Sequence, residues 1–322
     1  MKKEKGNIQM SKETKEIPIF FAIDDNYIKF LTVTIKSLIA NSSKENNYAL
    51  KILYTNVSDE RKEKIKKFEK ENVSIEFIDV TKYIEKIQEK LYTRDYFSNT
   101  TYYRLFLPDL CPQYDKAIYI DSDTVLLKDI ANLYNIDMGD NLIAAVPDEA
   151  VQTIPVFAEY VEQVVGMAHA SNYFNAGVLL MNLEELRKFK FQEKFLYLLD
   201  NVTFTVAQDQ DYLNRLCKGR VKLLDKSWNK EPISGKDMDI EDINLIHYNL
   251  AFKPWHIDGI PYEEIFWKYA KETEYYDEML KIKAAYGEEE KQRDAECNEN
   301  LQKLAKKEAD CVGDDRYLRG DK

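Results

Sequence analysis

DKAIYIDSDTVLLKDIANLYNIDMGDNLIAAVPD, residues 115–148, contains two short apolar runs that each end abruptly at acidic residues. The runs are Ala117–Ile120 and Leu142–Val146, and they stop at the Asp121-Ser122-Asp123 triplet and at Asp148. Buried strands of an open α/β sheet have this form. Because such sheets bind their ligands beyond the carboxyl ends of the strands, these acidic residues mark a candidate site.

Asp121 and Asp123 lie one residue apart at a predicted strand end, so their negative charges repel each other. A hard divalent cation relieves this repulsion, and its oxygen-ligand chemistry suits Mg²⁺ or Mn²⁺. The same spacing occurs in Asp209-Gln210-Asp211 and Asp237-Met238-Asp239, but neither of these follows an apolar strand. The stretch therefore predicts a metal-dependent site that handles a phosphorylated substrate.

The flanking sequence alternates between strand-like and helix-like patterns, which predicts an α/β fold with a parallel sheet covered by helices on both faces. The other expected strands are Ile17–Ile23, Leu50–Tyr54, Val73–Val80, Gly177–Met181, Arg220–Leu224 and Ile243–His247. The expected helices are Lys29–Ala40, Asp59–Lys70, Tyr83–Tyr92, Thr100–Leu107, Ile154–Gly166, Leu183–Asn201 and Gln208–Lys218.

The composition limits the possible functions. A chain of 322 residues with 44% hydrophobic residues can bury a large core, and its net charge of −11 argues against a nucleic-acid binder. The four cysteines have no paired metal spacing, so we expect free thiols in a reducing compartment. Residues 1–16 are polar, without the apolar segment of a signal peptide, and no run is long enough to span a membrane. These features predict a soluble, cytoplasmic protein with a disordered N-terminal tail.

The C-terminal part has a different texture from a soft boundary near Pro261 onward. Residues 262–280 are rich in aromatic side chains at helical spacing, and residues 287–322 read as a charged, low-complexity tail. The aromatic helix fits packing on the core. A second interpretation is peripheral contact with the inner face of a membrane that holds a lipid-linked acceptor, although the segment lacks a polybasic cluster.

Several further polar residues lie where a ligand could reach them, and each also has a simpler explanation. His247 ends a strand-like run and could be a third metal ligand, and Lys253 could bind phosphate. Asp24 and Asn26 could grip a nucleoside, although Asp-Asn also favours a turn. The others are Asn175 and Gly177, which read as a turn or bulge, and Asp209 and Gln210, where Asp209 could simply cap a helix.

Seven segments, taken together and in order, resemble glycosyltransferase family 8, which includes bacterial lipopolysaccharide galactosyl- and glucosyltransferases and, more distantly, glycogenin. They are FFAIDDNY, TTYYRLFLPDL, YDKAIYIDSDTVLLKDI, AAVPD, YFNAGVLLMNL, DQDYLN and HYNLAFKPWH, and they run from about Ile17 to about His256. The resemblance implies a Rossmann-like, GT-A type fold with a mixed, mostly parallel sheet. We expect a catalytic domain at residues 17–261 and a helical extension with a charged tail at residues 262–322.

The resemblance also implies a retaining transfer of galactose or glucose from a UDP-sugar to a glycan or lipid-linked saccharide, dependent on Mn²⁺, with Mg²⁺ as a possible substitute. The implied metal ligands are Asp121, Asp123 and His247. The implied catalytic residues, around the donor sugar, are Asp148, Asp209 and Gln210. The implied substrate-binding residues are Asp24 and Asn26 for uridine, Lys253 for the diphosphate, and Arg104, Asn175 and Gly177 for the sugar.

Two departures from the family pattern and two alternative functions stay open. Many members have a glycine shortly after the metal histidine, where this chain has Asn249-Leu250-Ala251. Some galactosyltransferases carry a histidine in the segment corresponding to Asp95–Asn99, which here contains Tyr96 instead. The alternatives are a non-catalytic UDP-sugar or glycan-binding protein and a haloacid-dehalogenase-type phosphohydrolase, although several strand–helix units precede Asp121, where that family needs its nucleophile near the start.

Overall fold

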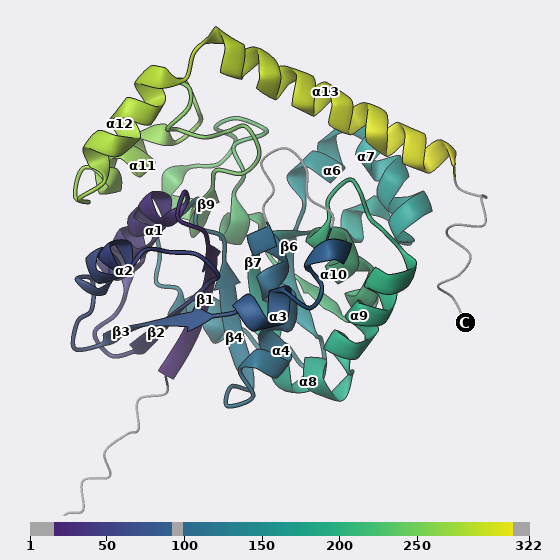
Figure 1. Cartoon of the computed structure of the whole chain (residues 1–322), viewed down its shortest axis with the longest axis horizontal. Coiled ribbons are helices and arrows are strands. Elements are labelled where there is room, and N and C mark those ends of the chain that lie inside the picture. The colour runs from purple at the N-terminus through teal and green to yellow at the C-terminus, as the bar shows by residue number, and fades with distance from the viewer. Residues whose placement is uncertain (1–15, 92–98, 312–322) are drawn as a thin grey trace, which may run out of the picture.

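The structure is a computed structural model, and it describes residues 16–91 and 99–311 of the chain. Its centre is a seven-stranded sheet in the order β3-β2-β1-β4-β7-β6-β8, beside a two-stranded sheet of β5 and β9 (Figure 1). The strands of the large sheet are β1 (Glu16–Ile23), β2 (Asn47–Tyr54), β3 (Val73–Asp79), β4 (Lys116–Ile120), β6 (Ile143–Pro147), β7 (Phe174–Asn182) and β8 (Val221–Leu223). Those of the small sheet are β5 (Thr124–Leu126) and β9 (Leu245–His247).

The large sheet is mixed and mostly parallel, which confirms the expected fold class. β7 runs antiparallel to both of its neighbours, β4 and β6, and the other adjacent pairs are parallel. The strands predicted from apolar runs are all present, some with longer and some with shorter bounds. β4 and β5 leave Asp121-Ser122-Asp123 between them, at the carboxyl end of β4.

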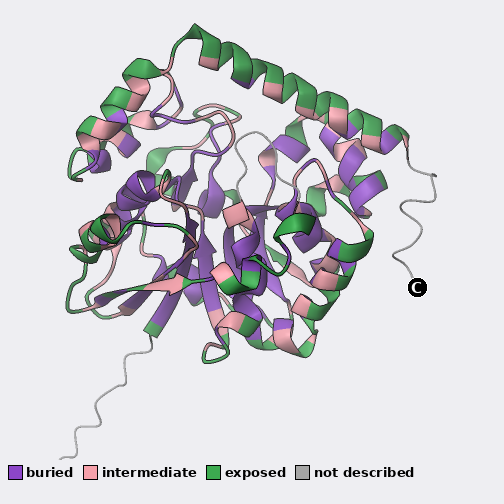
Figure 2. Cartoon of the chain, viewed as in Figure 1, coloured by how far each residue is buried: buried purple, intermediate pink, exposed green. Residues whose placement is uncertain are grey.

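Helices cover both faces of the sheet, and each face has its own hydrophobic cluster. Side chains of β1 alternate between the two clusters, with Ile19 and Phe21 in one and Phe20 and Ala22 in the other. A strand that is buried on both faces is apolar throughout, which explains why these segments read as continuous hydrophobic runs. Figure 2 shows the sheet as the buried centre of the molecule.

The α-helices are α1 (Ile28–Asn41), α2 (Asp59–Lys66), α3 (Thr81–Ile84), α4 (Leu107–Leu110), α5 (Ala131–Tyr134), α6 (Glu149–Thr153), α7 (Pro155–Tyr160), α8 (Leu183–Lys188), α9 (Phe191–Asn201), α10 (Asp209–Cys217), α11 (Glu263–Ala270), α12 (Tyr276–Ala285) and α13 (Glu288–Asp310). The 3-10 and π segments are η1 (Gln88–Lys90), η2 (Asn99–Phe106), η3 (Val161–Val165), η4 (Ala170–Asn172), η5 (Lys226–Asn229) and η6 (Ile240–Asp242).

Some expected helices differ from those in the structure. The segment predicted as one helix from residue 183 to 201 is two, because Lys190 has a φ of 58° and the left-handed backbone breaks the run. Only short turns, α3 and η1, occupy the described part of the segment predicted as Tyr83–Tyr92. α2 ends at Lys66 rather than Lys70, and η2 is a 3-10 helix.

The expectation of a low-complexity tail from residue 287 is wrong for residues 288–310. They form α13, a 23-residue helix, and the Gly287 N–H just before it donates to the Glu290 carboxylate at 2.9 Å. Ala305 and Ala309 are buried, and the element that α13 contacts most is α7. Its outward face is exposed along most of its length (Figure 2). Its charged residues therefore form the solvent side of an amphipathic helix.

The aromatic segment after Pro261 packs on the core, as the simpler interpretation predicted. Phe266, Tyr269 and Met279 are buried in the hydrophobic cluster that also contains Ile19 and Phe21 of β1. Leu280 is the one large apolar side chain that α11 and α12 expose. Within the described residues, every helix is too short or too polar to cross a bilayer.

Candidate functional site

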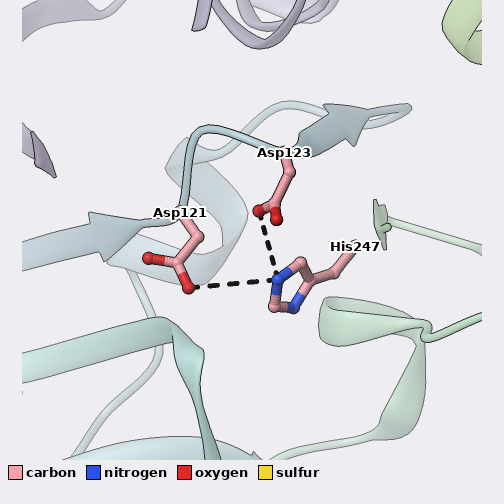
Figure 3. A group of neighbouring side chains, drawn as sticks. All are labelled: Asp121, Asp123 and His247. Atoms are coloured by element: carbon pink, nitrogen blue, oxygen red, sulfur yellow. Dashed lines mark ion pairs between the residues drawn. The ribbon is translucent and has the colours of Figure 1, made fainter. Parts of the chain in front are cut away.

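Three potential metal ligands converge at the carboxyl ends of β4 and β9. Asp121 follows β4, Asp123 precedes β5, and His247 is the last residue of β9. β5 and β9 pair antiparallel with Thr124 opposite His247, which brings the imidazole beside the two carboxylates. His247 Nε2 lies 3.3 Å from Asp123 Oδ1 and 3.9 Å from Asp121 Oδ2 (Figure 3). The structure thus brings together the three residues that the sequence analysis selected as metal ligands.

The loop that carries the two carboxylates is held by helix α1. Thr34 donates its hydroxyl to the carbonyls of Ser122, at 3.0 Å, and Thr124, at 2.8 Å. The backbone N–H of Tyr248 donates to the Asp123 carbonyl at 2.9 Å, so β9 is tied to the same loop. These bonds fix both carboxylates relative to His247 before any ligand arrives.

The donor set fits a hard divalent cation. One oxygen or nitrogen ligand atom from each of Asp121, Asp123 and His247 lies within 4.8 Å of the other two. Asp123 Oδ1 is fully buried and has no hydrogen-bond donor among the described residues. Buried carboxylate oxygens are normally paired, so this atom marks a place where a positive charge is needed. Two carboxylates and one imidazole suit Mn²⁺, or Mg²⁺ with more water.

Lys253 reaches the other side of Asp123. Its Nζ lies 2.5 Å from Asp123 Oδ2 and donates to the Tyr248 carbonyl at 2.6 Å, in a buried position. Burial is the largest single effect and lowers the pKa of Lys253, but Asp123, Tyr27 and Asp121 together outweigh it and leave that pKa above its ordinary value. Lys253 therefore places a positive charge beside the candidate metal ligands, where a partner for a diphosphate was predicted from the sequence.

Arg104 is a buried clamp between two carboxylates. It contacts Asp121 Oδ1 at 3.0 Å through Nη2 and Asp209 Oδ2 at 3.1 Å through Nε, and it also donates to the Ala176 carbonyl. Burial, with a further contribution from Asp121, raises the pKa of Asp209 to about 6, against the opposing effect of Arg104. Asp209 begins α10, but its carboxylate points to Arg104, so its interpretation as a simple helix cap is wrong.

A second group of side chains surrounds Asp148. Asn175 Nδ2 and Gln210 Nε2 both donate to Asp148 Oδ2 at 3.0 Å, and Gln210 Oε1 accepts the backbone N–H of Ala176 at 2.8 Å. Asp148 Oδ1 accepts from the N–H of Val151 and so caps α6. Both ends of the Gln210 amide are thereby engaged, which fixes its orientation.

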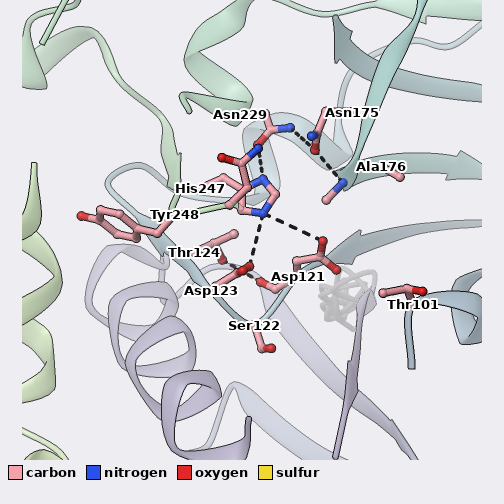
Figure 4. A network of polar contacts seen from close by, with 12 residues as sticks. Thr101, Asp121, Ser122, Asp123, Thr124, Asn175, Ala176, Asn229, His247 and Tyr248 are labelled. Atoms are coloured by element: carbon pink, nitrogen blue, oxygen red, sulfur yellow. Dashed lines mark hydrogen bonds and ion pairs between the residues drawn. The ribbon is translucent and has the colours of Figure 1, made fainter. Parts of the chain in front are cut away.

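Gly177 is needed for close packing rather than for backbone freedom. It lies within β7, so this segment is not a turn, but the pairing of β7 with β6 shifts register here, which agrees with the predicted bulge. A Cβ at Gly177 would lie 2.2 Å from His247 Cε1 and 2.7 Å from its Nδ1. The absence of a side chain therefore lets the imidazole lie directly on the strand (Figure 4).

Ten of the twelve predicted site residues line one pocket. The empty space inside it, with the open solvent at its mouth included, is about 1340 Å³. Asp24 and Asn26 are the two that do not line it, whereas Tyr27 does. The Asp24 carboxylate accepts the N–H groups of Asn26 and Tyr27 at 2.9 and 3.0 Å. Asp24 thus makes the turn that its sequence favours, and its contact with uridine remains a prediction.

The segment after His247, where many family members have a glycine, has an unusual backbone conformation in this chain. Leu250 lines the pocket with a φ of 49°, in the left-handed region that glycine adopts at little cost. The chain therefore keeps a glycine-like conformation with a leucine side chain at this place. The other departure, at Tyr96, lies outside the described residues.

Two buried residues of the site escaped the sequence analysis. Asn229 lies between His247 and Asn175, with one hydrogen bond of 2.9 Å to each. Glu231 accepts from the N–H of Glu149 at 2.8 Å and from Asn175 Nδ2 at 3.1 Å, and burial raises its pKa well above the ordinary value. Both lie in the segment WNKEP between β8 and β9, which has neither periodicity nor a motif to mark them.

The chain is similar to proteins that transfer sugars. The model of the family "Glycosyl transferase family 8" matches residues 18–259. A lipopolysaccharide 1,2-glucosyltransferase of Escherichia coli K12 is 28% identical over 74% of this chain and 72% of its own length. A lipopolysaccharide 1,3-galactosyltransferase of Salmonella typhimurium is 24% identical over 79% of this chain and 77% of its own.

Solved structures extend this likeness to the fold. The galactosyltransferase LgtC, solved in complex with donor and acceptor sugar analogues, is 29% identical to this chain and superposes with a TM-score of 0.66. The match covers 80% of this chain and 96% of LgtC. The architecture described above is thus the GT-A type.

Proposed function

The chain belongs to glycosyltransferase family 8, and from this premise we propose that it transfers a hexose from a UDP-sugar to an acceptor hydroxyl, with retention of anomeric configuration and dependence on Mn²⁺ or Mg²⁺. The observation that carries the proposal is the convergence of Asp121, Asp123 and His247 around a buried carboxylate oxygen that lacks a donor. A cation bound there would offset negative charge on the departing UDP.

The chain's own charged groups are arranged for such a departure. The Lys253 ammonium lies at the metal carboxylates and can stabilise a diphosphate that enters beside them. Arg104 holds Asp121 and Asp209 at fixed separation, so the metal side and the proposed sugar side of the pocket share one rigid support. These groups are in place before the substrate binds, which reduces the reorganisation needed during the reaction.

Gln210 has an electrostatic role in this proposal. An amide is a poor nucleophile, and both ends of the Gln210 amide are already hydrogen-bonded. Retention then follows if the acceptor hydroxyl attacks from the face that UDP leaves and the departing phosphate oxygen takes its proton. Asp148, Asn175 and Gln210 would hold the donor sugar in position during this step.

The donor hexose is galactose or glucose, and the acceptor is a glycan or a lipid-linked saccharide. The two curated relatives described above are a glucosyltransferase and a galactosyltransferase that act on lipopolysaccharide. The two hexoses differ in the configuration of one carbon, so selection between them depends on a few contacts around the sugar.

UDP release from UDP-glucose and UDP-galactose, measured with and without Mn²⁺ and with a panel of acceptor glycans, tests the proposal. We expect metal-dependent release with one donor, and near-complete loss in Asp123→Asn with an unchanged circular dichroism spectrum. Asp239→Asn is the matched control, because Asp239 is exposed in a similar Asp-x-Asp sequence away from the pocket. UDP-sugar binding without any turnover would instead support a non-catalytic binding protein.

A further inference from the structure

Asn229 connects the candidate metal ligand His247 to the strand beside it. It ends η5, is 3% exposed, and lies between two polar side chains rather than in the pocket itself. Its Oδ1 is 2.9 Å from His247 Nδ1, and its Nδ2 is 2.9 Å from Asn175 Oδ1 (Figure 4). The nitrogen that Asn229 contacts is the one that points away from Asp121 and Asp123.

The direction of each hydrogen bond in this chain follows from a backbone group that can only donate. The N–H of Gly177 donates to Asn175 at 2.8 Å, so the Asn175 atom that it meets is the amide oxygen. The other end of Asn175 is then the NH₂ group, which agrees with its two carboxylate partners, Asp148 and Glu231. Asn175 therefore has a single possible orientation.

The same reasoning fixes Asn229 and then the imidazole. Because Asn175 presents an oxygen, the Asn229 atom facing it must be the NH₂ group. The oxygen of Asn229 then faces His247 Nδ1, and an oxygen can only accept. In the neutral ring the proton must lie on Nδ1, which leaves the lone pair on Nε2 directed at Asp123 Oδ1 and Asp121 Oδ2.

We propose that Asn229 is a positioning residue that holds His247 in the Nδ1–H tautomer, so that the lone pair of Nε2 is available to a divalent cation. This inference rests on the proposed metal-dependent function. Groups that orient a metal-ligating imidazole through its second nitrogen are a general feature of metal sites. Here the orienting group is itself oriented by the backbone of β7, through Asn175 and Gly177.

The same hydrogen-bond chain continues to the proposed sugar side of the pocket. Asn175 donates to Asp148, which also accepts from Gln210. One connected set of amides therefore orients the metal ligand at one end and the carboxylate at the other. Loss of Asn229 should weaken cation binding first, because its direct contact is with His247.

The tautomer can be measured in the metal-free protein by ¹⁵N NMR with selectively labelled histidine. The chain has three histidines, and His247→Gln identifies the signal of interest. At about pH 8 we expect a protonated Nδ1 and a bare Nε2 for His247 in the wild type. A wild-type His247 with its proton on Nε2 would overturn the inference, whether or not the protein turns over a UDP-sugar.

Variants at Asn229 give a second, independent readout. Asn229→Ala removes the acceptor for Nδ1–H, so we expect mixed tautomers and Mn²⁺ affinity about 10–100-fold weaker by calorimetry or by electron paramagnetic resonance of free Mn²⁺. Asn229→Asp keeps an acceptor oxygen for Nδ1–H but turns its second oxygen toward Asn175 Oδ1, so we expect the tautomer to be retained while the protein becomes less stable to unfolding. Asn244→Ala is the matched control, since its amide bonds Ser227 outside the pocket.

The outcomes separate this inference from the proposed function. If the wild type binds Mn²⁺ and Asn229→Ala binds it equally well with His247 in the same tautomer, Asn229 has no positioning role. If the wild type shows the Nδ1–H tautomer but binds no Mn²⁺, the metal-dependent function fails while the hydrogen-bond assignment stands. If Asn229→Ala does not fold, the wild-type tautomer and the Asn229→Asp variant still decide the question.

Discussion

Gly177→Ala would introduce one methyl group against the imidazole of His247. Gly177 lies in β7, and its φ is outside the positive range, so an alanine fits the backbone there. The new Cβ would be 2.2 Å from His247 Cε1, whereas an ordinary contact begins at 3.4 Å. The ring would have to retreat by about 1.2 Å, the difference between these two distances.

That displacement is large compared with the tolerances of the site. His247 is held by the 2.9 Å bond to Asn229 and lies 3.3 Å from Asp123 Oδ1, so a shift of this size disrupts one or both relations. Overpacking of a tight site costs about 1–3 kcal/mol of folding stability. A misplacement of about 1 Å in a catalytic arrangement reduces turnover by about 100-fold.

Three measurements check this prediction: thermal or urea unfolding, Mn²⁺ affinity, and Mn²⁺-dependent UDP release. Gly287→Ala is the control, because Gly287 also has a negative φ and its nearest neighbour is the flexible end of Glu290 at 3.3 Å. We expect Gly287→Ala to behave as the wild type in all three. Wild-type metal affinity and turnover in Gly177→Ala would refute the claim that the close approach of His247 matters.

Three further predictions concern other parts of the molecule. Arg104→Met should lower the free energy of unfolding by about 3–5 kcal/mol, because it leaves Asp121 and Asp209 without their buried cation; a urea titration showing a loss below about 1 kcal/mol would contradict it. Burial raises the pKa of Asp211 to about 6, so the folded state holds that proton more tightly than the unfolded chain, and stability falls as pH rises from about 4 to about 6. Relative to Asp211→Asn, the free energy of unfolding of the wild type should fall by up to about 3 kcal/mol over this pH range. If the two free energies of unfolding change in parallel with pH, the Asp211 carboxyl is not the group responsible. Ala305→Arg should place a charge in the buried contact of α13 and speed proteolysis of that helix, and an unchanged cleavage pattern would mean that the contact contributes little.

Much of the fold could be predicted because the central strands of the large sheet are buried on both faces. Such strands are apolar runs that stop at polar residues, and each run in the sequence corresponds to a strand. The direction of β7 could not be predicted from its own residues, because a central strand has the same composition whether it is parallel or antiparallel. The break at Lys190 was also hidden, since a lysine carries no signal for a left-handed backbone.

The candidate site was predictable where chemistry is concentrated at strand ends. Asp121, Asp123 and His247 stand out because each polar group follows or precedes an apolar run. Asn229 and Glu231 could not be found in this way, because their importance depends on contacts with residues distant in sequence. α13 was mistaken for a tail because its packed side has few apolar residues, chiefly Leu301, Leu304, Ala305 and Ala309, within an otherwise charged sequence.

α13 also connects two parts of the pocket wall that are distant from each other in the sequence. At its start, Tyr286 stacks on His256 at 4.1 Å, in the loop that carries Lys253, and its C-terminal half packs on α7 (Figure 1). A helix of 23 residues is about 35 Å long. α13 therefore links the loop that carries Lys253 to α7, whose Phe157 lines the pocket, by a route outside the central sheet.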